Sequence, residues 1–147
     1  MSMRMKYSLE EVLCFSVKPK AKATVKRYYA IWRKKKGVPI RCDNPVCSFH
    51  TKKLEWNEKD LPLILDHENG NNKDNRIENL RYLCPNCDAQ LPTKGGRNIG
   101  RVTHLSEGGY RLKHFSGKTS QVIIGKGETI TTNSGSGKIT HNKALNN

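Results

Sequence analysis

Two short cysteine pairs constrain this chain more than any other feature of its sequence. Cys42 and Cys47 flank a turn-forming Asp-Asn-Pro stretch, and Cys84 and Cys87 form a Cys-x-x-Cys knuckle about forty residues later. Two such pairs can supply the four thiolates of a tetrahedral zinc site. The sequence therefore predicts one structural Zn²⁺ ion held by Cys42, Cys47, Cys84 and Cys87, with the middle of the chain folded around this cross-link.

Other roles for these thiols are less well supported. A redox Cys-x-x-Cys is the rival interpretation of Cys84 and Cys87, but no strand–helix–strand pattern surrounds the pair. A disulfide framework is disfavoured because no export signal is evident and cytosolic thiols stay reduced. His50 could compete as a ligand, but four cysteines already fill a tetrahedron, so we expect His50 to face solvent. Cys14 is interpreted as an ordinary buried thiol.

The charge of the chain indicates its class of partner. The 147 residues carry a formal net charge of +14, and only 35% of them are hydrophobic, which allows a modest core. Residues 1–41 hold twelve Lys and Arg against two acids, residues 42–97 eight against nine, and residues 98–147 seven against two. A cationic surplus favours a polyanion such as DNA, although lysines that merely maintain solubility are the alternative. No apolar run of about 18 residues is present, so we expect no membrane partner and a soluble, cytoplasmic protein.

The first 38 residues read as a basic helical arm. The capping-box pattern Ser8-Leu9-Glu10-Glu11 predicts a short helix to about Phe15, and a second helix is expected from about Lys20 to Lys36. The pair could form a helix-turn-helix-like DNA reader, or the second helix could lie along phosphates without reading bases. Together with two cations of a later Gly-rich stretch, the predicted DNA contacts are Lys26, Arg27, Arg33, Lys34, Lys35, Lys36, Lys94 and Arg97.

The middle of the chain reads as strand, loop, strand and helix. Alternating leucines from Leu61 to Leu65 predict a short strand that ends at Asp66 and His67. The polar stretch ENGNNKDNRIEN is a loop, and its asparagines are most simply turn chemistry. Residues 80–83 can pair back as a second strand, after which the cysteine knuckle opens a short helix that carries Asp88.

This order of elements and residues resembles the HNH endonuclease family. Asp66-His67, then Asn79 in IENLR, then the knuckle LCPNCDAQ match the family pattern over roughly residues 42–98. The resemblance implies a ββα-metal core that hydrolyses DNA phosphodiester bonds with a divalent cation. In it His67 is the general base, Asp66 and Asp88 are ligands of the catalytic cation, and Asn79 is a clamp that bonds loop backbone and orients His67.

One position departs from the family pattern. Asp88 stands where the family usually has a histidine, and a carboxylate there favours Mg²⁺ or Mn²⁺ over metals that prefer nitrogen. The alternative is that Asp88 is an exposed acid in the first turn of a helix, and that a former nuclease now only binds DNA. Glu68, next to the loop, could also approach the cation.

These patterns together predict an α+β fold in three parts. A helical arm spans residues 1–38, a zinc-stapled ββα-metal core spans 39–98, and a basic β-hairpin arm with a flexible tail spans 99–147. The predicted function is metal-dependent cleavage of DNA, in the cytoplasm of a bacterial cell or a phage-infected host. A zinc-stapled DNA-binding module without catalysis, an RNA-directed nuclease and a homodimer remain open alternatives.

Overall fold

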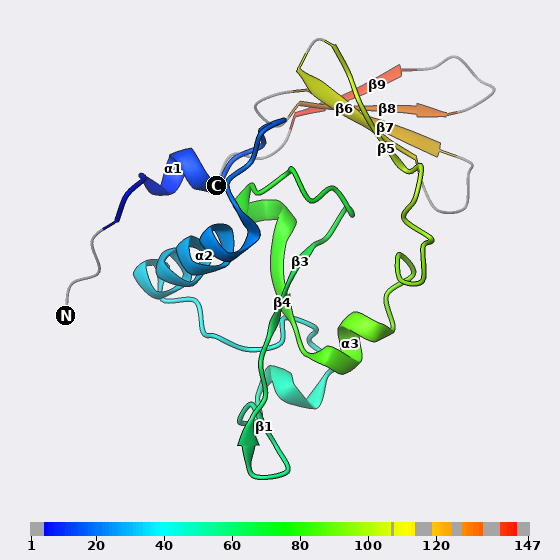
Figure 1. Cartoon of the computed structure of the whole chain (residues 1–147). Helices are drawn as coiled ribbons and strands as arrows, with labels where there is room; N and C mark the ends of the chain where they lie inside the picture. The colour runs from blue at the N-terminus through cyan, green and yellow to red at the C-terminus, as the bar shows by residue number, and fades with distance from the viewer. Residues whose placement is uncertain (1–4, 107, 114–118, 125–127, 134–138, 144–147) are drawn as a thin grey trace. The chain divides into compact units, whose positions relative to one another are not determined.

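The computed structural model describes residues 5–106, 108–113, 119–124, 128–133 and 139–143. The chain divides into two compact units (Figure 1). The N-terminal unit comprises Met1–Glu68 and Asn72–Leu91, and the C-terminal unit comprises Asn69–Asn71 and Pro92–Asn147. Helices and short antiparallel strands both occur, which confirms the predicted α+β class. Within the described residues, no helix is long and apolar enough to cross a membrane.

Two helices open the N-terminal unit. The predicted capping box is present at Ser8 and Glu11, but helix α1 covers only Leu9–Val12 because Leu13 already leaves the helical conformation. Helix α2 spans Lys22–Lys36 and ends at Gly37, whose left-handed φ of 71° lets its N–H bond back to the last turn. The buried residues of α2 lie at helical spacing, so one stripe of this basic helix faces the core. They are Val25, Tyr28, Tyr29 and Arg33.

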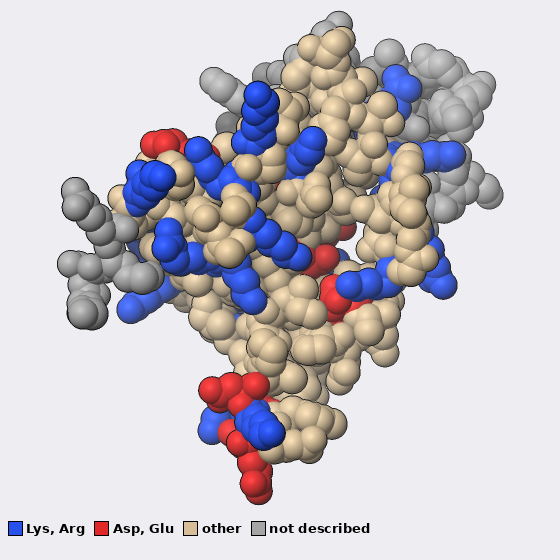
Figure 2. Space-filling view, viewed as in Figure 1, with Lys and Arg blue, Asp and Glu red and all other residues tan. Residues whose placement is uncertain are grey.

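A small hairpin follows the first cysteine pair. The 3-10 helix η1 (Ser48–His50) leads into β1 (Glu55–Trp56) and β2 (Lys59–Asp60), which pair antiparallel. Asn57 and Glu58 join the two strands with φ values of 52° and 64°, the left-handed geometry that tight hairpin turns require. Acidic side chains gather at this hairpin, whereas Lys and Arg gather over α2 (Figure 2).

The centre of the N-terminal unit is a second hairpin and a short helix. Strand β3 (Ile64–His67) pairs antiparallel with β4 (Leu80–Leu83), and the 3-10 helix η2 (Ile77–Asn79) precedes β4. Helix α3 (Pro85–Ala89) follows the second strand directly. The hairpin packs against α2, where Tyr29 donates a hydrogen bond of 3.0 Å to the Leu80 carbonyl and lies 5.1 Å, ring to ring, from Tyr82. The predicted strand, loop, strand and helix are therefore present.

The C-terminal unit contains one five-stranded antiparallel sheet in sequential order. Its strands are β5 (Val102–His104), β6 (Gly109–Lys113), β7 (Thr119–Ile124), β8 (Glu128–Asn133) and β9 (Ile139–Lys143). Tyr110 and Leu112 of β6 are buried. The expectation of a hairpin and a flexible tail was wrong for residues 139–143, because β9 pairs with β8 along five residues.

Candidate metal centre and active site

The four cysteines of the sequence motif converge on one point. The sulfur atoms of Cys42, Cys47, Cys84 and Cys87 all lie within 4.8 Å of one another. Backbone N–H groups point at two of them, from Cys84 to the Cys42 sulfur at 3.3 Å and from Cys87 to the Cys84 sulfur at 3.4 Å. This cluster is a site that could hold a metal ion such as zinc. Across the described residues, it is the one group of three or more His, Cys, Asp or Glu side chains with that property.

The electrostatics of the cluster fit a cation. Burial raises the pKa of Cys42, and burial together with the neighbouring thiols raises the pKa of Cys87 to about 12. At Cys84 burial opposes ionisation, but hydrogen bonds from the Cys87 backbone and from the adjacent thiols outweigh it and lower the pKa. Four thiols this close cannot all ionise beside one another without a compensating positive charge, and zinc binding supplies that charge.

His50, the competing candidate ligand, and the fifth cysteine, Cys14, are not part of this cluster. Nδ1 of His50 lies 2.9 Å from the Cys42 carbonyl oxygen, and the ring does not join the thiol group. Cys14 is half-buried, contacts the Glu11 carbonyl through its sulfur at 3.4 Å, and has a pKa raised by burial. Cys14 is thus less buried than the sequence suggested.

The ion pair between Arg33 and Asp43 contradicts one predicted DNA contact. Arg33 is 2% exposed and binds Asp43 through two nitrogens at 2.7 and 2.9 Å. Asp43 also accepts the Tyr82 backbone N–H at 2.7 Å, so the pair joins α2 to β4. Arg33 is therefore a structural residue and cannot reach a phosphate from this position.

The remaining predicted DNA contacts are all exposed, and two of them also make contacts within the chain. Lys26 is exposed, but its ammonium donates a hydrogen bond of 2.7 Å to the Leu63 carbonyl. Arg27 is exposed and lies over the Tyr28 ring, 5.4 Å from its centre. The other predicted contacts are Lys34, Lys35 and Lys36 at the end of α2, and Lys94 and Arg97 in the C-terminal unit.

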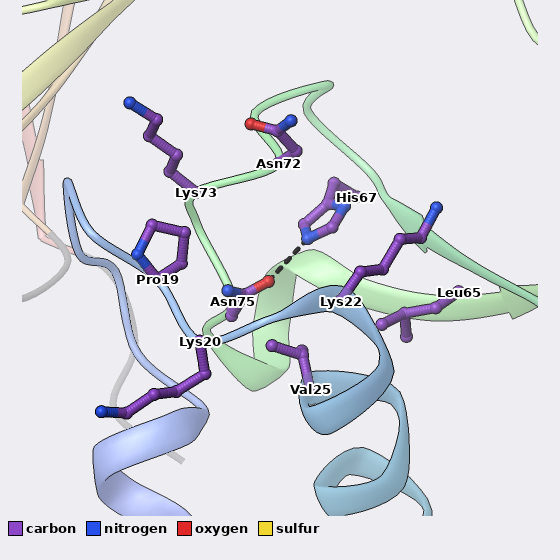
Figure 3. Close-up of a pocket in the computed structure, with 9 residues that line it drawn as sticks. All are labelled: Pro19, Lys20, Lys22, Val25, Leu65, His67, Asn72, Lys73 and Asn75. Carbon is purple, nitrogen blue, oxygen red and sulfur yellow. Dashed lines mark hydrogen bonds between the residues drawn. The ribbon is translucent and has the colours of Figure 1, made fainter.

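Asp66 and His67 point to opposite faces of β3, as adjacent residues of a strand do. Asp66 lies opposite Arg81 in the strand register, and its carboxylate contacts the Arg81 guanidinium at 2.7 Å. His67, together with Leu65, faces the other way and lines a pocket of about 260 Å³ (Figure 3). The two halves of the Asp-His motif are thus separated by the strand itself.

The His67 pocket is cationic. Three lysines are among its lining residues, namely Lys20 just before α2, Lys22 at the start of α2 and Lys73 in the loop after β3, and no carboxylate is among the described residues that line it. Nε2 of His67 lies 2.7 Å from Oδ1 of Asn75 (Figure 3). Asn75 and the three lysines were not predicted as site residues. Loops often contain asparagines that only form turns and lysines that only face solvent, so the sequence does not distinguish these four residues from ordinary loop residues.

Asn79 fastens the loop that carries Asn75. It is 6% exposed, and its side-chain amide donates a hydrogen bond of 2.8 Å to the Asp74 backbone carbonyl. Its own carbonyl accepts the Glu68 N–H at 2.8 Å. Asp74 is fully buried and binds Arg76 through both carboxylate oxygens, at 2.7 and 2.6 Å. The loop is therefore closed at its base by Asn79 and braced internally by an ion pair.

Asp88 lies in the first turn of α3, which begins at the second cysteine pair. Its exposed fraction is only 9%, so it is not the solvent-facing acid of the alternative interpretation. Asp66, 14% exposed in its side chain, and Asp88 are the two residues that the sequence predicted as ligands of a catalytic cation, and they lie on β3 and α3. Arg81, the partner of Asp66, is a further site residue that sequence reasoning missed, although its place opposite Asp66 follows once the hairpin register is known.

Comparison with known proteins gives one informative relative. The chain is 52% identical over 65 residues to the H-N-H endonuclease F-TflIV of Escherichia phage T5, and these residues are 44% of this chain but only 26% of the phage protein. No family model matches the chain, and no solved structure matches it. The match confirms the resemblance to an HNH endonuclease that the sequence indicated. The chain is therefore related, over less than half of its length, to an HNH endonuclease.

Proposed function

We propose that this chain is a metal-dependent DNA endonuclease that hydrolyses phosphodiester bonds with a water molecule activated by His67. The observation that carries the proposal is the position of His67 on the wall of a pocket whose described lining residues include three lysines and no carboxylate. A histidine is the side chain best suited to accept a proton at physiological pH, and ammonium groups attract a phosphate. The relationship to a phage protein named an endonuclease supports the same chemistry.

In the proposed reaction, His67 takes a proton from water while the water oxygen attacks phosphorus and the bond to the leaving oxygen breaks. Lys22 and Lys73 attract the substrate backbone by charge, whereas the Lys20 ammonium lies over the Tyr7 ring, 4.2 Å from its centre. Asp66 and Asp88 would hold a divalent cation, Mg²⁺ or Mn²⁺, whose charge stabilises the phosphate and the leaving oxygen. Two carboxylates fit such an ion, because Mg²⁺ is usually bound by one or two carboxylates and completes its octahedron with water and phosphate oxygens.

The arrangement of β3 limits where the substrate can lie. Asp66 and His67 are the last two residues of the strand and face opposite sides of it. If His67 activates the water and Asp66 binds the cation at the same phosphate, that phosphate must lie at the end of β3, beside the loop that Asn79 closes. The four-cysteine site has a structural role, because zinc bound there fixes the start of α3 and so the position of Asp88.

Conversion of supercoiled plasmid to nicked or linear forms tests the proposal. We expect conversion with Mg²⁺ or Mn²⁺, and a loss of about 10² to 10⁴-fold in His67→Ala, with DNA binding retained in a gel-shift assay. Failure of the native protein to cut with any divalent metal, while it still binds DNA, would establish a DNA-binding module instead. Cleavage confined to an RNA control would show an RNA-directed nuclease.

A further inference from the structure

Asn75 has a contact with the base that the family motif does not assign. Its side-chain oxygen lies 2.7 Å from Nε2 of His67, and Asn75 is only 2% exposed. An amide oxygen can accept a hydrogen bond but cannot donate one, so Nε2 must carry the proton in this contact. In a neutral ring the other nitrogen, Nδ1, then has the free lone pair. The contact therefore determines which atom of His67 can act as a base.

The position of Asn75 is itself fixed by the chain that precedes α2. The Asn75 N–H donates to the Cys14 carbonyl at 3.1 Å, and the Ser16 N–H donates to the Lys73 carbonyl at 3.2 Å. Phe15 and Asp74 form an antiparallel bridge between these bonds. Residues 14–16 thus add a short paired segment to the loop. All of these bonds join main-chain atoms, so they fix the loop backbone at Asn75 itself.

Asn79 holds the same loop from the other side. It bonds the carbonyl of Asp74, the residue immediately before Asn75. The Asn79 amide bonds the loop backbone, whereas the Asn75 amide oxygen contacts Nε2 of His67. Asn79 is therefore the clamp that closes the loop, and Asn75, four residues earlier, makes the contact with His67.

We propose that Asn75 is the positioning residue of His67, which sets the ring orientation and leaves Nδ1 free to accept a proton from water. This inference rests on the proposed nuclease function. It also gives residues 14–16 a part in catalysis, since they anchor Asn75. The N-terminal segment then serves the reaction as well as the binding of DNA.

Two substitutions separate positioning from simple support of the fold. Asn75→Asp keeps an acceptor oxygen at the same place, whereas Asn75→Leu has a similar volume and no acceptor. Loss of an orienting hydrogen bond to a functional histidine typically costs about 10 to 100-fold in activity. We expect that loss in kcat for Asn75→Leu, with KM unchanged and zinc retained, and we expect Asn75→Asp to keep most of the native kcat.

A spectroscopic readout tests the inference without any variant at position 75. Nitrogen NMR of the native protein, with the His67 signals assigned from their absence in His67→Ala, should show a protonated Nε2 and an unprotonated Nδ1 in the neutral ring. A proton on Nδ1 would overturn the inference, whether or not Asn75→Leu folds.

The activity results separate this inference from the proposed function. Cleavage by the native protein together with an unchanged kcat in Asn75→Leu would overturn the positioning role and leave the nuclease function standing. Absence of cleavage by the native protein with every metal would overturn the proposed function, and the catalytic role of Asn75 with it. Equal losses in the Asp and Leu variants would also contradict the inference, because the acceptor oxygen would then be irrelevant.

Discussion

Asp66 and Arg81 face each other across the β3–β4 pair, in register and joined by an ion pair of 2.7 Å. The carboxylate proposed to bind the catalytic cation is therefore already neutralised by a guanidinium. Both side chains are largely shielded from water, with exposed fractions of 14% and 29%. Arg81 and a divalent cation must compete for the same oxygens, so the pair is expected to weaken metal binding and to hold Asp66 in place until the metal arrives.

Removal of Arg81 should strengthen metal binding. Arg81→Gln frees the Asp66 carboxylate, and release from one partly shielded ion pair corresponds to about 1 kcal/mol, or about fivefold tighter Mn²⁺ binding. Calorimetric titration with Mn²⁺ in the His67→Ala background measures this without turnover. Lys53→Gln is the control, because it removes a cation from the exposed ion pair with Glu55 at the β1–β2 hairpin. Unchanged Mn²⁺ affinity in Arg81→Gln would show that Asp66 does not bind the cation.

The ligand at position 88 should set metal preference. Asp88→His introduces a nitrogen ligand, so it should stay active and shift preference from Mg²⁺ or Mn²⁺ toward Ni²⁺ or Co²⁺. Asp88→Ala should weaken Mn²⁺ binding in the same titration. Glu78→Ala removes an exposed carboxylate from the nearby η2 and should leave that affinity unaltered. If Asp88→Ala binds Mn²⁺ and cuts DNA as the native protein does, Asp88 is not a ligand.

Zinc should be stoichiometric and structural. Elemental analysis of protein purified without chelator should give one zinc per chain, and Cys84→Ser should lose it and melt at a much lower temperature. The expected size is large, because structural zinc contributes roughly 10 kcal/mol or more, which is comparable to the stability of a domain. Cys14→Ser lies outside the cluster and should keep its zinc. Equal melting temperatures for Cys84→Ser and the native protein would refute the site.

Replacing the cations at the end of α2 should affect DNA binding at Lys34, Lys35 and Lys36 but protein stability at Arg33. Replacing Lys34, Lys35 and Lys36 by Gln should reduce the salt dependence of DNA binding by a slope of up to about 3, with little change in melting temperature. Arg33→Leu should instead lower the free energy of unfolding by about 3 kcal/mol, because it leaves Asp43 without its partner. Gel-shift titrations at several salt concentrations and thermal unfolding measure the two effects. An unaltered salt slope in the triple variant would show that α2 does not face phosphate.

The features that could be predicted from the sequence are those that depend on residues close together in the chain. The two cysteine pairs, the capping box at Ser8 and Glu11, and the strand that ends at His67 were predictable, because each follows from spacing or turn chemistry within a few residues. Arg33 was misassigned with the basic run, although Val25, Tyr29 and Arg33 recur every four residues and so share one helix face.

Other parts of the fold left no such signal. Asn75 could not be told from its neighbouring asparagines, since its partner His67 is brought near only when the loop closes. The strand β9 was missed because its Ser- and Gly-rich flank resembles a linker, and the evidence for the strand is its pairing with β8. The pairing of Asp66 with Arg81 required the register of the hairpin, which composition does not encode.

The wide separation of the two cysteine pairs has a consequence for the order of folding. Cys42 and Cys84 are 42 residues apart, whereas β1 with β2 and β3 with β4 pair over short stretches of chain. Hairpins form in microseconds, and contacts distant in sequence form more slowly. Excess zinc added to the unfolded chain can therefore capture the nearby thiols of one pair first, and such misligated chains must release the ion before they reach the native state. Refolding should consequently be faster when zinc is supplied after the hairpins have formed than when it is present from the start.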